Sequence, residues 1–400
     1  MIIRQLSLTN FRAFKRMEIE FPSNLNIIVG ENAQGKTSIL EAVHFLSLLT
    51  SPIAGQDRQM IRLLALEDEI PVGRLVAVVE KANKVHSIEV RLIIGGSGNG
   101  ATRLRKEVII DGSKRKLLDA VGYFNSVIFL PQMMRIIEDG PDERRKYLDR
   151  TLSQAFPGYV RALSAYNQGI TRRNALLKQI FELGGSRDQL VYWDELITEH
   201  GAVIIYTRAN AVRALSKYMC RQHEKLTCGK ERIMLSYISS VVLNEGGRDQ
   251  PSFSVTDEIA EDVSVDVIKK MFLRQLKDQQ DEEIRRGVTT IGPHRDELRF
   301  IVNNIDLGIY GSRGQIRTAV MALKLAEVYW LQAQTGETPV LLLDETLAEL
   351  DHQRRQDLLG VLEQNSQSIL TTTDLRLFDP AFIEKCRVWS IHNGNIMENH

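Results

Sequence analysis

Consecutive residues near the N-terminus have the types and the spacing of a phosphate-binding loop. Such a loop has a glycine, four further residues and then Gly-Lys-Thr, because glycines let backbone N–H groups turn toward a phosphate. Lys36 would reach the β- and γ-phosphates of a nucleoside triphosphate, and the hydroxyl of Thr37 would be a ligand of Mg²⁺. The sequence therefore predicts a nucleotide site formed by the loop and the residue after it: Gly30, Glu31, Asn32, Ala33, Gln34, Gly35, Lys36, Thr37 and Ser38.

Two neighbouring carboxylates follow an apolar run near the other end of the chain. The run Leu341–Leu343 is typical of a buried strand, and Asp344 and Glu345 come directly after it. A carboxylate at the end of a buried strand is costly unless a cation meets it. We therefore expect Asp344 to hold Mg²⁺, through Thr37 or a water molecule, and Glu345 to orient and deprotonate the water that attacks ATP. With Lys36, these carboxylates are the predicted catalytic residues.

The separation of the two motifs indicates how the fold is built. Asp344 lies roughly 300 residues beyond Lys36. An ATPase core must therefore be made from both ends of the chain, with the middle of the chain inserted between them.

The hydrophobic pattern predicts the elements that would position these residues. The run Leu25–Val29 is an apolar strand leading into the loop, and the helix after it has Ile39, Leu40, Val43 and Leu46 on one face. Val340–Leu343 and Ser368–Thr372 are short apolar runs of the kind that is buried in a parallel sheet. Further strands are expected at Ile2–Leu8, Leu75–Val79, Ser87–Ile94 and Glu107–Ile110.

The middle of the chain has a helical pattern. Apolar residues repeat at heptad-like spacing on both sides of the turn Gly184-Gly185-Ser186, which predicts a short antiparallel helical hairpin. A strand over Ile233–Leu243, a polar loop over Asn244–Pro251 and a helix from Asp257 to Arg286 are expected to follow. We therefore predict an α/β protein in three parts: residues 1–133 as the N-terminal part of the ATPase head, 134–286 as a helical arm, and 287–400 as the C-terminal part of the head.

Composition excludes several classes of protein. The 400 residues include 51 Lys and Arg against 51 Asp and Glu, so the formal net charge is zero and a globally basic nucleic-acid binder is excluded. No apolar run approaches the ~20 residues that span a membrane, and the N-terminus lacks the apolar core of a signal peptide. Cys220, Cys228 and Cys386 form no C-x-x-C pair, which favours reduced thiols in a cytoplasmic protein.

Several motifs, in consistent order from Ile2 to about Asp379, resemble a known family. The most specific is the run Gly292-Pro293-His294-Arg295-Asp296. Together the motifs resemble RecF, the family of ABC-type recombination mediators that are short-armed relatives of Rad50 and SMC heads. They are Phe11–Phe14, the phosphate loop with Glu41 after it, Gly292–Asp296, Ser312–Gln315, Leu341–Glu345 with Leu350 and Asp351, and Thr371–Thr373.

The resemblance implies both a fold and a function. The fold is an ABC-type P-loop ATPase head with an inserted, mainly helical arm. The function is a cytoplasmic protein that forms a homodimer on ATP, binds duplex DNA near single-strand gaps, and acts with RecO and RecR to load recombinase. Slow, DNA-stimulated ATP hydrolysis would reset the dimer.

The resemblance also implies roles for particular residues. Arg12 would touch nucleotide phosphate, and Gln132 would be a ligand of the metal or of a water molecule. Ser312, Gly314 and Gln315 would contact a γ-phosphate bound by the second subunit of the dimer. Without the resemblance, the turn at Ser312 is equally an ordinary capped start of a helix. His294 is expected to pack or to hydrogen-bond near the nucleotide site rather than to bind a metal.

The sequence departs from the family pattern at positions that bear on the ATP switch. Arg313 and Ile316 replace two glutamines, Ala348 replaces a serine, and Asp374 stands where many ABC relatives have a histidine. The segment Ser51–Gly55 replaces a Ser-x-Arg segment. Nucleotide binding is predicted to be intact. Two alternatives stay open: a divergent ATPase that binds ATP with little hydrolysis, and an ATPase subunit that acts on a protein or transporter partner.

Basic clusters are the candidates for DNA contact. No helix-turn-helix or zinc-finger signature is present, so we expect recognition of the DNA backbone with salt-sensitive affinity. The predicted contacts are Arg103, Arg105, Lys106, Lys114, Arg115 and Lys116.

Overall fold

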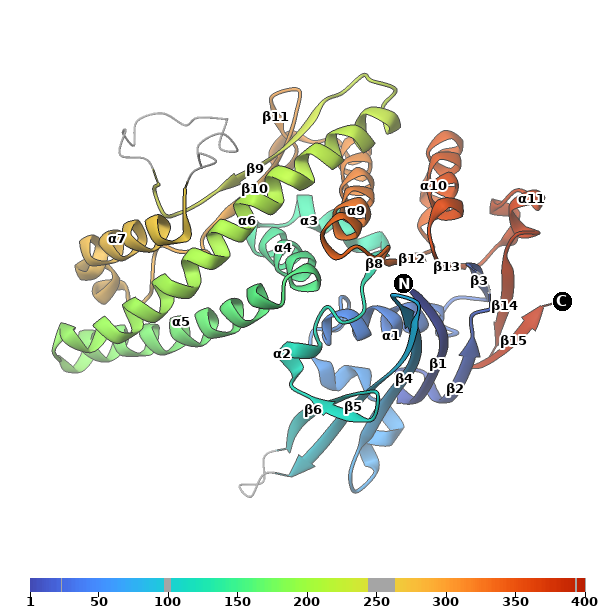
Figure 1. The fold of residues 1–400 in the computed structure, drawn as a ribbon, viewed down its shortest axis with the longest axis horizontal. Helices are drawn as coiled ribbons and strands as arrows, with labels where there is room; N and C mark the ends of the chain where they lie inside the picture. The colour runs from blue at the N-terminus through green and yellow to red at the C-terminus, as the bar shows by residue number, and fades with distance from the viewer. Residues whose placement is uncertain (23, 97–101, 244–262, 393, 400) are drawn as a thin grey trace. The chain divides into compact units, whose positions relative to one another are not determined.

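The computed structural model describes the chain except for residues 23, 97–101, 244–262, 393 and 400, and it divides into two compact units (Figure 1). The head unit consists of Met1–Met133 and Glu327–His400, and the arm unit of Met134–Ala326. The division after residue 133 coincides with the predicted one. Residues 287–326, which the sequence placed with the head, group instead with the arm unit, because β10 (Glu297–Val302) pairs with β9 (Ile233–Ile238).

The head unit contains two sheets. One is antiparallel, with its strands in the order β2-β1-β4-β5-β6-β7. The strands predicted in the first 130 residues are all present. In this sheet β2 and β7 are additional, because their charged residues give no clear hydrophobic pattern. The bounds are β1 (Ile2–Phe11), β2 (Phe14–Glu20), β4 (Val72–Lys81), β5 (Lys84–Gly96), β6 (Thr102–Ile110) and β7 (Ser113–Arg115).

The second sheet of the head unit has the order β15-β14-β3-β13-β12-β8. All neighbours from β14 to β8 are parallel, so their carboxyl ends lie along one edge, where open α/β sheets bind ligands. The predicted strands β3, β12 and β13 are confirmed. The bounds are β3 (Leu25–Val29), β8 (Ser126–Phe129), β12 (Val340–Asp344), β13 (Ser368–Thr372), β14 (Arg387–His392) and β15 (Asn395–Asn399).

Helix α1 (Lys36–Leu48) leaves the phosphate loop and contacts β8, β12 and β13. Its predicted apolar face, Ile39, Leu40, Val43 and Leu46, is buried in the core. The unit also contains α2 (Leu117–Ala120), which follows β7, the last part of α9 (Arg313–Thr335), α10 (His352–Gln364) and α11 (Pro380–Ile383). Short 3₁₀ turns connect these elements: η1 (Asp57–Met60), η2 (Leu63–Glu67), η3 (Pro131–Met134), η5 (Thr346–Glu349) and η6 (Leu375–Leu377).

The arm unit is built on the predicted helical hairpin, α5 (Pro157–Leu183) and α6 (Val191–Leu226), with η4 (Arg187–Leu190) in the turn. Figure 1 shows the two helices side by side, with α7 (Val265–Arg286) against them. Gly201 of α6 permits this packing, because a Cβ there would lie 2.7 Å from Cε1 of Phe272 on α7. The remaining elements are α3 (Arg135–Glu138), α4 (Pro141–Ala155), α8 (Leu307–Tyr310), the start of α9, and the sheet β11-β10-β9, where β11 is Ile305–Asp306.

Two predicted elements of the arm unit have different bounds. β9 ends at Ile238 rather than continuing to Leu243, and α7 begins at Val265 after its N-cap Ser264. The predicted polar loop Asn244–Pro251 and the predicted start of the helix at Asp257 lie outside the described residues. None of the helices that the structure describes is long and apolar enough to cross a membrane.

The run Gly292–Asp296 is anchored in the arm unit by hydrogen bonds. Nδ1 of His294 accepts a hydrogen bond from the Tyr166 hydroxyl at 2.6 Å, and its Nε2–H donates to the Thr289 carbonyl at 3.1 Å. The Asp296 carboxylate accepts hydrogen bonds from the Tyr237 hydroxyl and from the Ser240 N–H. His294 therefore hydrogen-bonds within the protein as a neutral ring, with contacts to α5 and to residue 289 of the arm unit, and its expected place near the nucleotide site stays a prediction.

We expect the stability of the protein to fall on mild acidification because of His294. Burial is the main cause that lowers the pKa of His294 from its usual value to about 4. Between pH 7 and 5 the unfolded chain binds a proton at this residue and the folded protein does not. Stability is therefore lost as the pH falls, by about 2 kcal/mol for this group. Urea unfolding of the wild type and of His294→Gln at both pH values measures the effect.

The control for this experiment is His352→Gln, a change of an exposed histidine on α10. His352→Gln should keep the pH dependence of the wild type, whereas His294→Gln should lose about 2 kcal/mol of it. An unchanged pH dependence in His294→Gln would contradict the assignment.

Candidate nucleotide site

The phosphate loop connects the carboxyl end of β3 to the first turn of α1, and both of its glycines are required by close contacts. A Cβ at Gly30 would lie 2.6 Å from Cγ2 of Ile391, and one at Gly35 would lie 2.8 Å from Cζ of Phe14. Gly35 also has φ 104°, a conformation that favours glycine. The loop is therefore held close to β14 and to β2, with the N-terminus of α1 open to an anion.

The Lys36 ammonium is held by the loop itself. Its Nζ donates to the carbonyl oxygens of Gly30 and Glu31 at 2.8 and 2.9 Å, and lies 3.0 Å from Oε1 of Glu345. The side chain is only 4% exposed. A bound phosphate would replace the Glu345 contact with a stronger charge-assisted one, which is the arrangement that the motif predicts.

Thr37 and Asp344 meet across the roughly 300 residues that separate them in sequence. The Thr37 hydroxyl lies 2.9 and 2.8 Å from the two carboxylate oxygens of Asp344, and the Thr371 hydroxyl donates to Oδ1 at 2.7 Å. Burial raises the pKa of Asp344, and the hydrogen bonds from Thr371 and Thr37 act against that rise. A cation here would compensate the buried negative charge.

The donor set suits Mg²⁺, a hard cation that takes oxygen ligands and usually keeps several waters. Asp344 and Thr37 offer such oxygens. Within the described part of the chain, no three His, Cys, Asp or Glu side chains are grouped so that they could enclose a metal ion. The residues present therefore fit a magnesium ion held by few protein ligands together with phosphate and water.

Glu345 and Gln132 lie at the same edge of the parallel sheet. Glu345 has φ 48°, and its backbone N–H donates to the Thr371 carbonyl at 3.3 Å. Such a backbone conformation is uncommon for a non-glycine residue and is found at functional sites. Gln132 is exposed in η3, directly beyond β8, and the structure shows no contact that joins it to Thr37 or Asp344.

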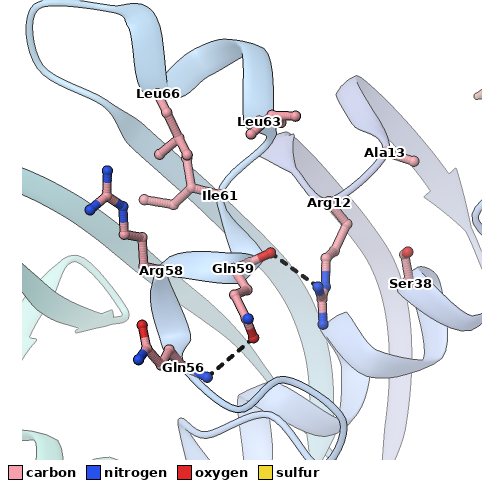
Figure 2. Close-up of a pocket in the computed structure, with 9 residues that line it drawn as sticks. All are labelled: Arg12, Ala13, Ser38, Gln56, Arg58, Gln59, Ile61, Leu63 and Leu66. Atoms are coloured by element: carbon pink, nitrogen blue, oxygen red, sulfur yellow. Dashed lines mark hydrogen bonds between the residues drawn. The ribbon is translucent and has the colours of Figure 1, made fainter.

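A cavity of about 500 Å³ lies beside the phosphate loop, with Arg12 and Ser38 on one side (Figure 2). The Arg12 guanidinium donates to both carboxylate oxygens of Glu41, each at 2.7 Å, and to the Gln59 carbonyl at 3.0 Å. Sequence reasoning found Arg12 and Ser38 but missed the rest of the lining: Ala13, Gln56, Arg58, Gln59, Ile61, Leu63 and Leu66. Apart from Ala13, which lies in the β1–β2 turn, these residues come from the short segment 56–66, whose sequence carries no periodic signal.

Ser312, Gly314 and Gln315 lie at the N-terminus of α9, in the arm unit. The Ser312 hydroxyl accepts a hydrogen bond from the Gln315 N–H at 3.3 Å, and the Gln315 side chain accepts one from the Ser312 N–H at 3.1 Å. This reciprocal arrangement is a capping box. The Ser312 O–H and the open Gly314 backbone remain able to meet an anion. Arg313 is exposed, whereas Ile316 is buried.

The other departures from the family pattern differ in their surroundings. Asp374 caps η6 and pairs with Arg376, whose guanidinium lies 2.8 Å away and lowers the pKa of Asp374 through a hydrogen bond. Asp351, which matches the family pattern, caps α10 by accepting from the Arg354 N–H at 2.9 Å. Ala348 lies in η5, and its side chain is outside the described parts.

The predicted DNA contacts lie on the last two strands of the antiparallel sheet. Arg103 and Arg105 are exposed on β6, Lys114 and Arg115 are exposed on β7, and Lys116 is exposed directly after β7. Lys106 is different, because alternation along β6 turns it inward, where Nζ lies 2.6 Å from Asp57.

Arg91 and Arg74, which the sequence analysis did not select, lie on the same outer face of this sheet. Arg91 of β5 is opposite Glu107 of β6, and Arg74 of β4 is opposite Arg91. Residues that are directly opposite one another share a face, so the outer face of the sheet has more arginine than the clusters in the sequence indicated.

Comparison with known proteins places the chain in a family. The model of the family described as the RecF/RecN/SMC N-terminal domain matches residues 2–396. The DNA replication and repair protein RecF of Roseiflexus castenholzii is 38% identical over 406 residues, and the RecF of Halalkalibacterium halodurans is 32% identical over 397 residues; in each case 99% of both chains is covered.

Solved structures have the same fold. The structure described as the recombination mediator protein RecF-ATP in the RecFOR pathway is 30% identical, with a TM-score of 0.83, and covers 100% of this chain and 97% of that one. An SMC head bound to the C-terminal winged-helix domain of ScpA is 15% identical with a TM-score of 0.50, which concerns the fold alone.

The two-sheet head, the phosphate loop facing Asp344 and Glu345, and the inserted helical arm together define an ABC-type head of the RecF/RecN/SMC class. Within that class, the relatives that match over the full length of the chain are RecF proteins. The chain belongs to the RecF family.

Proposed function

We propose that the protein binds ATP at the phosphate loop, with Mg²⁺ held by Thr37 and Asp344. The observation that carries this proposal is the meeting of Lys36 and Thr37 with Glu345 and Asp344 at one edge of the parallel sheet. The cavity lined by Arg12, Ser38 and the apolar residues of segment 61–66 has room for the nucleoside part. The ATP-bound RecF structure supports the same ligand.

We further propose a slow ATPase that works as a switch. Glu345 would take a proton from the attacking water, and the Thr371 contact to its backbone would keep its position. Lys36 would bind the β- and γ-phosphates. Ser312, Gly314 and Gln315 would meet the γ-phosphate of a second copy, so that the homodimer forms only with ATP.

DNA would be the partner of this ATP dimer. The name of the relatives, DNA replication and repair protein RecF, and the description of a solved structure as a recombination mediator in the RecFOR pathway support a role in DNA recombination. We propose that this role is exercised at gapped duplex DNA in the cytoplasm, with RecO and RecR as partners. The contacts that we propose are Arg103, Arg105, Lys114, Arg115 and Lys116, whose side chains are exposed. Lys106 is left out of this set because its side chain faces inward and pairs with Asp57, whereas Arg105 and Lys114, which pair with Glu107, remain exposed.

Binding to a gapped duplex with and without ATP–Mg²⁺, followed by fluorescence anisotropy, tests this function. We expect tight binding only with ATP. The double variant Arg103→Ala/Arg105→Ala should bind about 10-fold more weakly, and the slope of log affinity against log salt should fall by about 2, since two phosphate contacts are lost.

Arg387→Ala is the matched control, because Arg387 is also exposed and pairs with Glu398 at 3.1 Å on the parallel sheet. It should bind DNA as the wild type does. Binding that is equal with and without ATP would remove the switch from the proposal. No binding in either condition would favour an ATPase that acts on a protein or transporter partner.

A second candidate function is a divergent ATPase that binds ATP with little hydrolysis. The observation that favours it is Asp374, which places a carboxylate paired with Arg376 directly after β13, beside the strand of the phosphate loop. Tight ATP binding, together with a dimer that never dissociates during prolonged incubation with ATP, would favour this candidate.

A further inference from the structure

Glu41 is a buried carboxylate that holds Arg12 at the edge of the nucleotide cavity. The ion pair is bidentate, with Nε and Nη2 of Arg12 each 2.7 Å from one oxygen of Glu41. Glu41 is 2% exposed and Arg12 is 23% exposed. The carboxylate therefore lies inside the protein, while the guanidinium reaches from it to the cavity surface.

Ser51 supports the carboxylate from the other side. Its hydroxyl donates to Oε1 of Glu41 and accepts hydrogen bonds from the backbone N–H groups of Ile53 and Ala54, at 2.9 and 2.7 Å. Three separate segments, α1, the β1–β2 turn and residues 51–54, thus meet at one carboxylate. Glu41 cannot shift without disturbing all of them.

The contacts leave part of the guanidinium available. Of its five N–H groups, Nε–H and one on Nη2 go to Glu41, and one on Nη1 goes to the Gln59 carbonyl. In the described contacts, one N–H on each terminal nitrogen is left over. Donors that remain on both terminal nitrogens allow the guanidinium to meet phosphate oxygens while it stays paired with Glu41.

The backbone at Arg12 is consistent with a functional constraint. Arg12 has φ 51°, a left-handed conformation that is uncommon for a residue with a Cβ. Its N–H donates to the Met60 carbonyl at 2.8 Å, which holds the turn in this conformation. Strain of this kind persists where the surrounding structure fixes it, and it clusters at ligand sites.

We propose that Glu41, supported by Ser51, is the positioning residue that keeps the free edge of Arg12 turned toward the phosphates of the bound nucleotide. The inference rests on the proposed ATP binding. It assigns Glu41 no contact with the nucleotide; Glu41 acts through Arg12 alone.

A double-mutant cycle with Glu41→Gln and Arg12→Ala tests the proposal. Affinity is measured with a fluorescent ATP analogue, N-methylanthraniloyl-ATP, in the presence of Mg²⁺. The amide of Glu41→Gln fills the same volume but offers one acceptor oxygen and no charge, so Arg12 loses its bidentate partner. We expect each single variant to bind about 10-fold more weakly, and the double variant to bind no more weakly than Arg12→Ala alone.

Thermal stability separates positioning from a purely structural role. Arg12→Ala leaves the Glu41 charge buried, with Ser51 as its remaining side-chain donor, so its melting temperature should fall. Adding Glu41→Gln removes that charge and should restore the melting temperature without restoring the affinity for the ATP analogue. A residue that only supported the fold would recover both together.

Glu80→Gln is the matched control, because Glu80 pairs with Nε and Nη2 of Arg4 in the same unit, away from the cavity. It should leave ATP affinity unchanged. The proposal is overturned if Glu41→Gln binds as the wild type does, or if the two losses multiply in the double variant. Wild type that binds no better than Lys36→Ala would overturn the proposed function, and this inference with it.

Discussion

Lys36→Ala is expected to lower the affinity for ATP about 100-fold. The ammonium is 4% exposed and already lies among the acceptors of the loop, so a phosphate that enters needs only to replace Glu345. A charge-assisted hydrogen bond of this kind contributes about 2–3 kcal/mol when it is desolvated. Because the proposed homodimer forms only with bound ATP, it should disappear as well. Isothermal titration calorimetry and light scattering measure the two effects.

The matched control is Lys385→Ala. Lys385 forms a comparable lysine–glutamate pair, 2.9 Å from Glu363, but it is exposed and far along the chain from the loop. Loss of ATP binding in Lys36→Ala with retention in Lys385→Ala is the expected result. If both variants bind ATP as the wild type does, the loop is not the nucleotide site.

The second large effect is expected for Glu345→Gln, which should slow ATP hydrolysis by a factor of about 100 to 1,000 while keeping ATP binding. The amide cannot accept the proton of the attacking water, and a general base contributes rate factors of about this size. The substitution also releases Lys36 from its ion pair, which favours its contact with phosphate. The ATP dimer should therefore accumulate. Single-turnover hydrolysis and light scattering with ATP follow both properties.

Glu363→Gln, the other half of the exposed pair with Lys385, is the control for Glu345→Gln. It should hydrolyse ATP at the rate of the wild type. Equal amounts of ATP dimer in Glu345→Gln and Lys36→Ala would contradict the mechanism, because one variant keeps the triphosphate and the other cannot bind it.

Much of the head could be predicted because its signals are local. The strands β3, β12 and β13 are continuous apolar runs, and the loop is a contiguous motif. That the two ends of the chain form one core followed from a single inference, that Lys36 and Asp344 belong to one site, whereas the order of these strands in the sheet was not predicted. The contact of the Thr37 hydroxyl with Asp344 at 2.8 Å agrees with that inference.

Other features depend on contacts that the sequence does not encode locally. The pairing of Arg12 with Glu41 requires the β1–β2 turn to reach α1, and most of the cavity lining comes from a segment without periodicity. Lys106 looked like its basic neighbours, but its place in the register, opposite Leu92, decided which side of the sheet it faces. Residues 287–326 belong to the arm unit because β10 pairs with β9, which no local signal in the sequence indicates.

The place of β3 in its sheet has a consequence for how the chain folds during synthesis. β3 is made among the first 30 residues, yet both of its neighbours, β13 and β14, come from residues 368–392. The arm unit is one uninterrupted stretch and can fold on the ribosome as soon as it emerges. The phosphate loop must wait for the last strands, since contacts between distant segments form slowly. A chain that stops before them lacks the proposed nucleotide site, so the ability to bind ATP would report that synthesis has passed β14.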